Sequence, residues 1–186
     1  MNLLIFFKNI IQIVLSPVNG WKDIEKEDIP VETSIQRGLY PLMAVMLLTV
    51  FIRPLYGIMD FNLITLLQIA LGQFIALFAS LYISKSVMEH FLPTYNSSGE
   101  NDPIAVGNVA TYGTGVMTLI QIIENILPVE LTVIQLLPAF AAVCIWKSGK
   151  YLDIEREGEI QFMLIAIAAL ILPVIIINFF MHFLIE

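Results

Sequence analysis

Side chains suited to catalysis or metal binding are sparse in this chain. It has two histidines, His90 and His182, and a single cysteine, Cys144. The histidines fall near the ends of two different apolar runs, and if both runs cross a membrane the imidazoles lie about a membrane thickness apart. They could then share neither a metal ion nor a catalytic triad. The HExxH zinc helix, the P-loop and the GxSxG elbow are also missing from the sequence. We therefore expect no enzyme activity, no metal and no cofactor.

Two charged side chains, Arg53 and Glu124, are the ones nearest to membrane depth. Arg53 lies near the end of the first long run and Glu124 near the end of the third, while Asp60 lies in the connection that follows the first. An arginine at membrane depth pairs with a carboxylate or extends its head group to the interface. We predict that Arg53 pairs with Glu124 or Asp60, and that the pair is a structural clamp rather than a transport site.

Uncharged polar residues form a second candidate site in the third run. Asn108, Thr111 and Thr118 share one helical face with Asn125. This face has two interpretations: the lining of a polar path, or a packing face where hydroxyl and small side chains let helices approach and form hydrogen bonds. The run carries no charge before Glu124, which favours packing.

A stripe of small residues marks the second apolar run. It repeats every fourth position, at Gly72, Ala76, Ser80 and Ser84. This spacing places the small side chains on one helix face, where a neighbouring backbone can come close. We predict a helix-packing seam, formed either within the chain or against a second copy.

The segments that position these residues have the composition of an integral membrane protein. Apolar residues make up 58% and charged residues 13% of the chain, against roughly 45–50% and about 25% in soluble domains. Apolar runs near 20 residues match a hydrocarbon core of roughly 30 Å, and in lipid such a run must be a helix. A net charge of −7 with scattered Lys and Arg argues against nucleic-acid binding.

Five apolar segments are predicted to cross the membrane, giving an all-α fold. They are Gly38–Met59, Leu63–Val87, Ile104–Leu127, Leu131–Trp146 and Ile160–Ile185. The fourth would reach only about 24 Å as a helix, which is shorter than the hydrocarbon core. It would need to begin earlier, near Pro128, or the bilayer would need to thin locally.

The positive charges predict the orientation. With five spans, eight of the nine Lys and Arg residues fall on one side and only Arg53 falls on the other. The positive-inside rule then places the N-terminus in the cytoplasm and the C-terminus outside. A four-span alternative that omits the fourth run would put Lys147, Lys150 and Arg156 on the outer side. We therefore favour five spans, within a transmembrane domain of residues 31–186.

The first 30 residues are predicted to form a cytoplasmic unit on the membrane surface. Asn2–Leu15 is apolar but too short to span, and its polar residues form a narrow stripe that is typical of an amphipathic interfacial helix. A cleaved signal peptide is the alternative, but Lys8 interrupts its apolar core. We favour the interfacial helix, with Lys8 as a candidate contact to the membrane surface.

A turn is predicted after this helix. Pro17 cannot continue a helix, and Asn19-Gly20 suits a positive backbone φ. Trp21 would then lie at the membrane–water boundary, where tryptophan is enriched, with Lys22 beside it as a further interface residue. The charged stretch that follows would lead through water to the first span.

Four stretches resemble the Yip family, which comprises five-span membrane proteins named for interacting with Ypt/Rab GTPases, and specifically its bacterial members. They are SPVNGWKDI (16–24), GLYPLMAV (38–45), VATYGTGVMTLIQIIENILPV (109–129) and IWKSGKYLDIEREGE (145–159). The resemblance implies a five-helix bundle with a cytoplasmic N-terminus and an external C-terminus. It also implies the inner membrane of a bacterium as the location, a link to membrane shaping, and no defined reaction.

We expect a non-enzymatic protein that organises the lipid bilayer, a second copy of itself or another membrane protein. The alternative is a small transporter or channel with a polar path along the third span. A transporter should show a water-accessible cavity beside Asn108, Thr111 and Thr118. A scaffold should show these three residues packed and dry.

Overall fold

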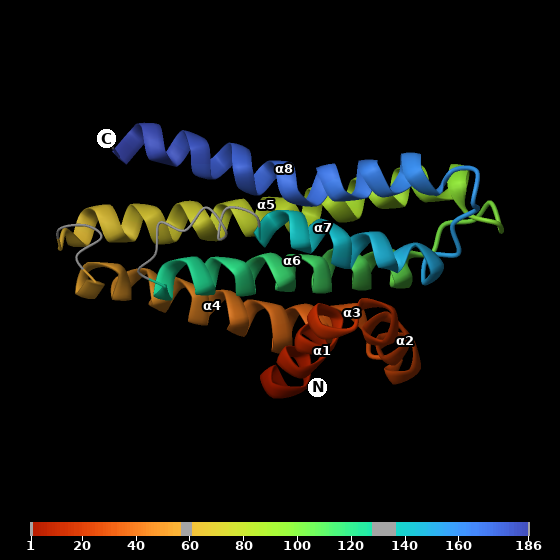
Figure 1. Ribbon diagram of the computed structural model, residues 1–186, viewed down its shortest axis with the longest axis horizontal. Coiled ribbons are helices and arrows are strands. Elements are labelled where there is room, and N and C mark those ends of the chain that lie inside the picture. The colour runs from red at the N-terminus through yellow and green to blue at the C-terminus, as the bar shows by residue number, and fades with distance from the viewer. Residues whose placement is uncertain (1, 57–60, 128–136, 186) are drawn as a thin grey trace.

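The computed structural model describes residues 2–56, 61–127 and 137–185, and the regular elements in these ranges are helices (Figure 1). Four of them are long and apolar enough to cross a membrane: Val31–Tyr56, Leu63–Tyr95, Pro103–Ile126 and Glu159–Met181. The prediction of an all-α membrane protein is therefore confirmed at this level, whereas five full spans are not established.

The first long helix combines several helix types. The elements before it are α1 (Leu3–Leu15) and α2 (Pro17–Glu27); the helix itself comprises α3 (Val31–Ser34), the π-helix η1 (Ile35–Leu39), α4 (Tyr40–Thr49) and the 3₁₀-helix η2 (Val50–Tyr56). The π-helix ends at Leu39, two residues before Pro41. Because proline has no N–H to donate to the carbonyl one turn earlier, the α-helical ladder is interrupted there. Pro54, which likewise has no N–H to donate, lies within η2.

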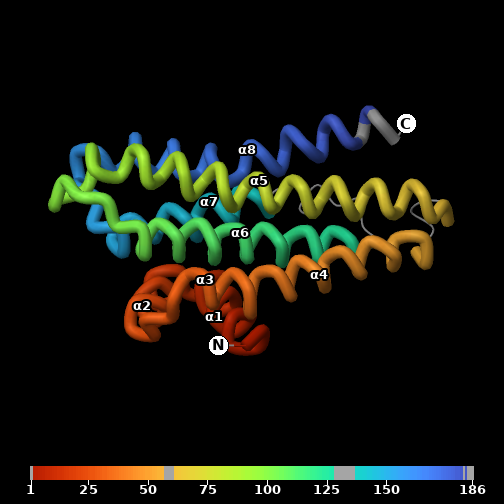
Figure 2. Tube along the Cα trace, turned by 180° about the vertical axis from the view of Figure 1, so that it is seen from behind, coloured from red at the N-terminus to blue at the C-terminus, as the bar shows by residue number. Residues whose placement is uncertain are grey.

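The remaining elements run back and forth along the long axis of the molecule. They are α5 (Leu63–Tyr95), α6 (Pro103–Ile126), α7 (Leu137–Trp146), η4 (Lys147–Lys150) and α8 (Glu159–Ile185). Figures 1 and 2 show α4, α6 and α8 pointing one way and α5 the other. Because α6 ends where α5 begins and α8 begins where α5 ends, the chain returns along the bundle between α6 and α8.

Helix α7 covers only part of that return. Its 10 residues span about 15 Å, roughly half of a hydrocarbon core. Of the predicted fourth span, Leu131–Trp146, residues 131–136 lie outside the described ranges, and α7 accounts for the remainder. Within residues 2–56, 61–127 and 137–185, the bundle thus contains four long apolar helices together with the 10-residue α7, all running along the same axis.

The small-residue face of α5 lies against α8 within the chain. A Cβ atom placed on Gly72 would lie 2.7 Å from the Met181 side chain, and the Ser80 hydroxyl donates a 2.5 Å hydrogen bond to the Leu170 carbonyl. Ala76 and Ser84 on the same face are fully buried. Small side chains thus let these two helices approach closely over a long stretch.

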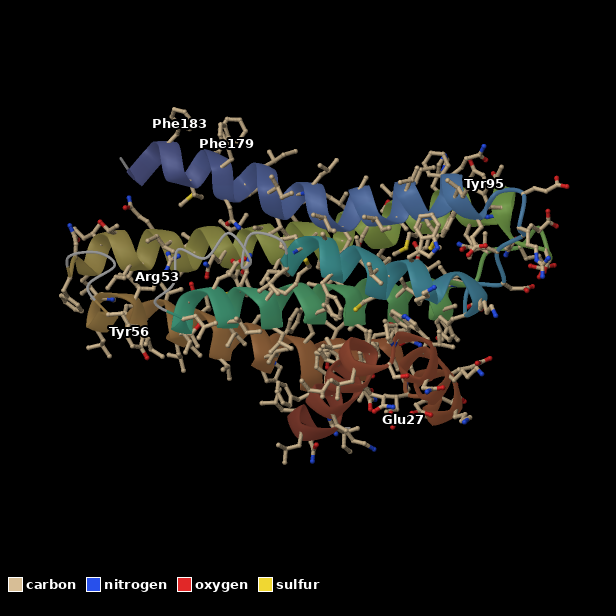
Figure 3. All side chains as sticks on the ribbon, viewed as in Figure 1. Glu27, Arg53, Tyr56, Tyr95, Phe179 and Phe183 are labelled. Atoms are coloured by element: carbon tan, nitrogen blue, oxygen red, sulfur yellow. The ribbon has the colours of Figure 1, made fainter. Side chains whose placement is uncertain are left out.

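Most charged residues collect at the end of the bundle where α5 meets α6 and η4 meets α8. The connection from α5 to α6 and the one from η4 to α8 are hydrogen-bonded to each other there. The Ser97 N–H donates to the Asp153 carbonyl over 3.1 Å, and the Glu155 N–H donates to the Tyr95 carbonyl over 2.9 Å. Figure 3 shows Tyr95 at this end and Arg53 at the opposite one. We call it the charged end.

Candidate functional site

Helix α1 packs into the bundle beside α6. Phe6, Ile10 and Ile13 are fully buried, and the Phe6 ring stacks on Tyr112 with 4.9 Å between ring centroids. A Cβ atom on Gly115 of α6 would lie 2.7 Å from Ile10, so the glycine makes room for α1. The N-terminal helix is therefore not held by the bilayer alone, since it shares the protein core.

A buried amide joins α1 to two other helices. Asn9 is 4% exposed, and its Nδ2 donates to Glu27 Oε2 of α2 over 2.7 Å and lies 3.4 Å from the Tyr112 hydroxyl of α6. A hydrogen bond to a carboxylate is stronger than one between neutral groups. Asn9, one residue of the predicted polar stripe, thus forms hydrogen bonds inside the protein and does not face the membrane surface.

The turn predicted at Asn19-Gly20 is wrong. Helix α2 begins directly after Ser16, with Pro17 at its first turn, where a missing N–H costs nothing. Asn19 and Gly20 are helical, and Gly20 faces α1 so closely that a Cβ atom there would lie 2.7 Å from the Ile13 backbone. The chain needs glycine at this position for close contact rather than for a positive φ. We call α1 and α2 together the hairpin.

Trp21 is buried rather than placed on the membrane–water surface. It is 2% exposed, its Nε1–H donates to the Cys144 carbonyl over 2.9 Å, and its ring lies 5.8 Å from that of Tyr151. A buried indole satisfies its single donor in this way. The ring fastens α2 to α7 and η4, while Lys8 and Lys22, the other two predicted interface residues, are exposed.

Tyr151 extends this junction to α6. Its hydroxyl accepts a 2.9 Å hydrogen bond from Asn108 Nδ2. Burial raises the pKa of the Tyr151 hydroxyl above its usual value, and the bond from Asn108 opposes that shift only in part. The phenol therefore stays neutral at physiological pH and acts as a structural hydrogen-bonding group.

The third-span hydroxyls, for which the sequence favours a packing face over a path lining, are buried. Thr111 and Thr118 are 0% exposed, and they donate to the carbonyls of Gly107 and Thr114 on their own helix over 2.6 and 2.8 Å. Three pockets lined by described residues all lie toward the charged end, and neither threonine lines any of them.

Asn108 is the exception among the three path candidates. It is 5% exposed, but it lines a pocket of about 220 Å³ beside Asp102, Glu25 and Tyr151. This pocket lies where α6 begins, next to the loop that precedes that helix. Asn108 therefore lies at the polar boundary of the bundle, and the pocket does not extend to Thr111 or Thr118.

A second buried polar cluster, which the sequence analysis did not predict, lies toward the end of the bundle opposite the charged end. Asn125 Nδ2 donates to Thr49 Oγ1 and to Gln73 Oε1, each over 3.1 Å, and Asn125 Oδ1 accepts from Gln73 Nε2 over 3.2 Å. All three residues are buried and come from α4, α5 and α6. An amide inside each of two apolar runs was the available signal, but it does not identify the partners.

The predicted clamp at Arg53 is not a close ion pair with Glu124. Within the described ranges no contact of 4.0 Å or less joins them, although the two charges lie near enough to interact electrostatically. The Arg53 Nε atom is buried without a hydrogen-bond partner. Asp60, the other predicted partner, lies outside the described residues.

No group of three or more His, Cys, Asp or Glu side chains in the described part of the chain is arranged to hold a metal ion. Comparisons with protein-family models, with curated proteins and with solved structures find no match to the chain. The resemblance to the Yip family therefore stays a prediction. What the geometry defines is an all-α membrane protein with a docked N-terminal hairpin.

Proposed function

We propose that this chain is a non-enzymatic, Yip-like protein of the bacterial inner membrane, and that its hairpin shapes or organises the surrounding bilayer. One observation carries the proposal. The hairpin lies against one side of the bundle in the half nearer the charged end, whereas the described elements that reach the opposite end are long helices (Figures 1 and 2). Such a molecule occupies more area in one leaflet than in the other.

The outer surface of the hairpin supports contact with lipid. Leu4 and Leu15 are 76% and 77% exposed, and Val18 at the start of α2 is 43% exposed. Meanwhile the opposite face of α1 is fixed to α6 by Phe6 and Ile10. A rigid helix with a bare apolar face is a wedge that enters the interfacial layer of a membrane.

A vesicle-sorting experiment tests whether the hairpin inserts into the membrane as a wedge. Purified protein reconstituted into a mixture of small and large vesicles is expected to reach a higher density on the small, strongly curved ones. The variant L4Q/L15Q, which alters only exposed hairpin residues, should lose most of that preference. The control L55Q/F61Q alters two equally exposed apolar residues away from the hairpin, 80% and 71% exposed, and should keep it. Equal density of the wild-type protein on all vesicle sizes would overturn the proposal.

The runner-up, a transporter or channel, makes a different prediction at Thr111 and Thr118. With Cys144 replaced by alanine, a cysteine introduced at either threonine is expected to resist a membrane-impermeant thiol reagent, because both side chains are packed against neighbouring helices. A cysteine in place of exposed Asn101 should react at once and serves as the control. Rapid labelling at Thr111 and Thr118 would favour the polar path over the scaffold.

A further inference from the structure

A small pocket between α2 and η4 gathers most of its charge from lysines. Its volume is about 110 Å³, and it is lined by Val18, Trp21, Lys22, Glu25, Lys147, Lys150 and Tyr151. Its lining thus holds three lysines and a single acidic residue, Glu25. One lysine comes from the hairpin and two from η4, so the pocket exists only when the hairpin is docked.

These three lysines do not form ion pairs with other described residues. The ion pairs in the described ranges are Lys26–Asp23 at 3.8 Å and Lys85–Glu89 at 3.9 Å, and both lie outside the pocket. Lys22, Lys147 and Lys150 are all exposed. Their charges are therefore available to an anion from outside the chain.

The lysines lie where two helices pass from apolar to charged sequence. Along α2, exposed Val18 is followed by Lys22 and then by a stretch of charged residues. Along α7, the apolar run ends at Trp146, and Lys147 is the first charged residue after it. In a membrane protein this transition marks the depth of the lipid head groups.

The two transitions are brought to one place by Trp21. Its hydrogen bond to the Cys144 carbonyl and its stacking on Tyr151 fix α2 against the end of α7. Lys22 follows Trp21 directly, and Lys147 follows Cys144 within one helical turn. The buried indole thus sets the spacing of the lysines and forms a rigid apolar wall beside them.

We propose that this pocket binds the phosphate of an anionic phospholipid. The lysines neutralise the phosphate, and Val18 and Trp21 lie beside the glycerol and the first methylene groups. Basic pockets between transmembrane elements are the established kind of site for such head groups. A lipid fits better than a free phosphate ion, because part of the pocket wall is apolar and the site lies at the membrane boundary. This inference goes beyond the proposed function and does not require membrane shaping.

Lipid retention by the wild-type protein and by two triple variants tests the site. Protein in nanodiscs of mixed phosphatidylglycerol and phosphatidylcholine is expected to retain phosphatidylglycerol preferentially when it is extracted with mild detergent. The variant K22Q/K147Q/K150Q should reduce that preference about tenfold, since each basic residue near a membrane surface contributes substantially to binding anionic lipid. The control K26Q/K85Q/R156Q removes the same charge outside the pocket and should keep the preference.

Two further measurements distinguish a lipid site from a free-phosphate site and from a general loss of stability. Excess inorganic phosphate should not displace the lipid, and full displacement would show a phosphate site instead of a lipid site. Thermal unfolding of both triple variants should stay close to that of the wild-type protein, because five of the six side chains are exposed and Lys85 is only half-buried. Equal loss of preference in both variants, or none in the pocket variant, would overturn the proposal. The vesicle-sorting experiment reads a different surface, so either proposal can fail alone.

Discussion

Replacing Gly20 by valine is expected to separate α1 from α2 and to lower the thermal stability of the protein. A Cβ atom at this position would lie 2.7 Å from both the Cα and the N atom of Ile13. These are backbone atoms, so no rotamer change relieves the overlap and one helix must move. Valine gains about 0.5 kcal/mol over glycine in helix propensity. Overpacking costs typically about 1–3 kcal/mol and more against rigid neighbours, so destabilisation dominates.

Movement of α2 would spread to its other contacts. Trp21, the next residue, would shift away from the Cys144 carbonyl, and the bond between Asn9 and Glu27 would lengthen. We therefore expect earlier thermal unfolding in detergent, and faster proteolysis at the joint around Ser16, than in the wild-type protein.

The matched control for this prediction is G149A. Gly149 is also buried and helical, but the nearest atom to its added Cβ would be Glu159 Oε1 at 3.4 Å, the mobile end of a side chain. This variant should unfold close to wild type. If G20V unfolded no earlier than G149A, the close packing of the two helices would be wrong.

The starts of α5 and α6 could be predicted from sequence because lipid imposes simple rules on length and polarity, whereas the first long helix begins at Val31 and not at the predicted Gly38. The second predicted span begins at Leu63, as α5 does, since Asn62 accepts hydrogen bonds from the Ile64 and Thr65 N–H groups and caps the helix. Asp102 and Pro103 likewise set the start of α6, within one residue of the predicted Ile104. Local signals were sufficient at both of these boundaries.

The hairpin could not be derived in the same way. Asn19-Gly20 has the composition of a turn, but its real constraint is the backbone of Ile13, which local sequence does not show. Trp21 has the preference of an interface residue, yet a carbonyl at Cys144, far along the chain, supplies its acceptor and draws it inside. Contacts between distant segments outweighed the local propensities in both cases.

Polar residues within the spans posed a related problem. The sequence shows that Thr49, Gln73 and Asn125 are polar, but which of them meet depends on how each helix rotates about its own axis. The same uncertainty applied to Thr111 and Thr118, whose hydroxyls turned out to bond to their own helix. Helix rotation is set by packing over whole faces, so the hydrogen-bonded partners follow from the assembled bundle.

Replacing Asn125 by leucine is expected to destabilise the bundle by about 2 kcal/mol or more, because it strands Gln73. The Gln73 amide exchanges a donor and an acceptor with Asn125, and both would remain buried without partners, each costing about 1–3 kcal/mol. Thr49 is affected less, since its hydroxyl also donates to the Met46 carbonyl. An exposed amide gives the control: N101L should change thermal stability little.

The double variant Q73L/N125L identifies the cause. Two leucines of similar size replace both partners by apolar groups, which leaves no stranded amide and is nearly neutral when the shape is kept. We therefore expect the double variant to unfold close to wild type and later than N125L alone, giving a strong favourable coupling in a double-mutant cycle. A membrane hydrogen bond that is merely lost contributes only about 0.6 kcal/mol on average. Additive losses in the two single variants would therefore show that the Gln73–Asn125 pair is not what joins α5 to α6.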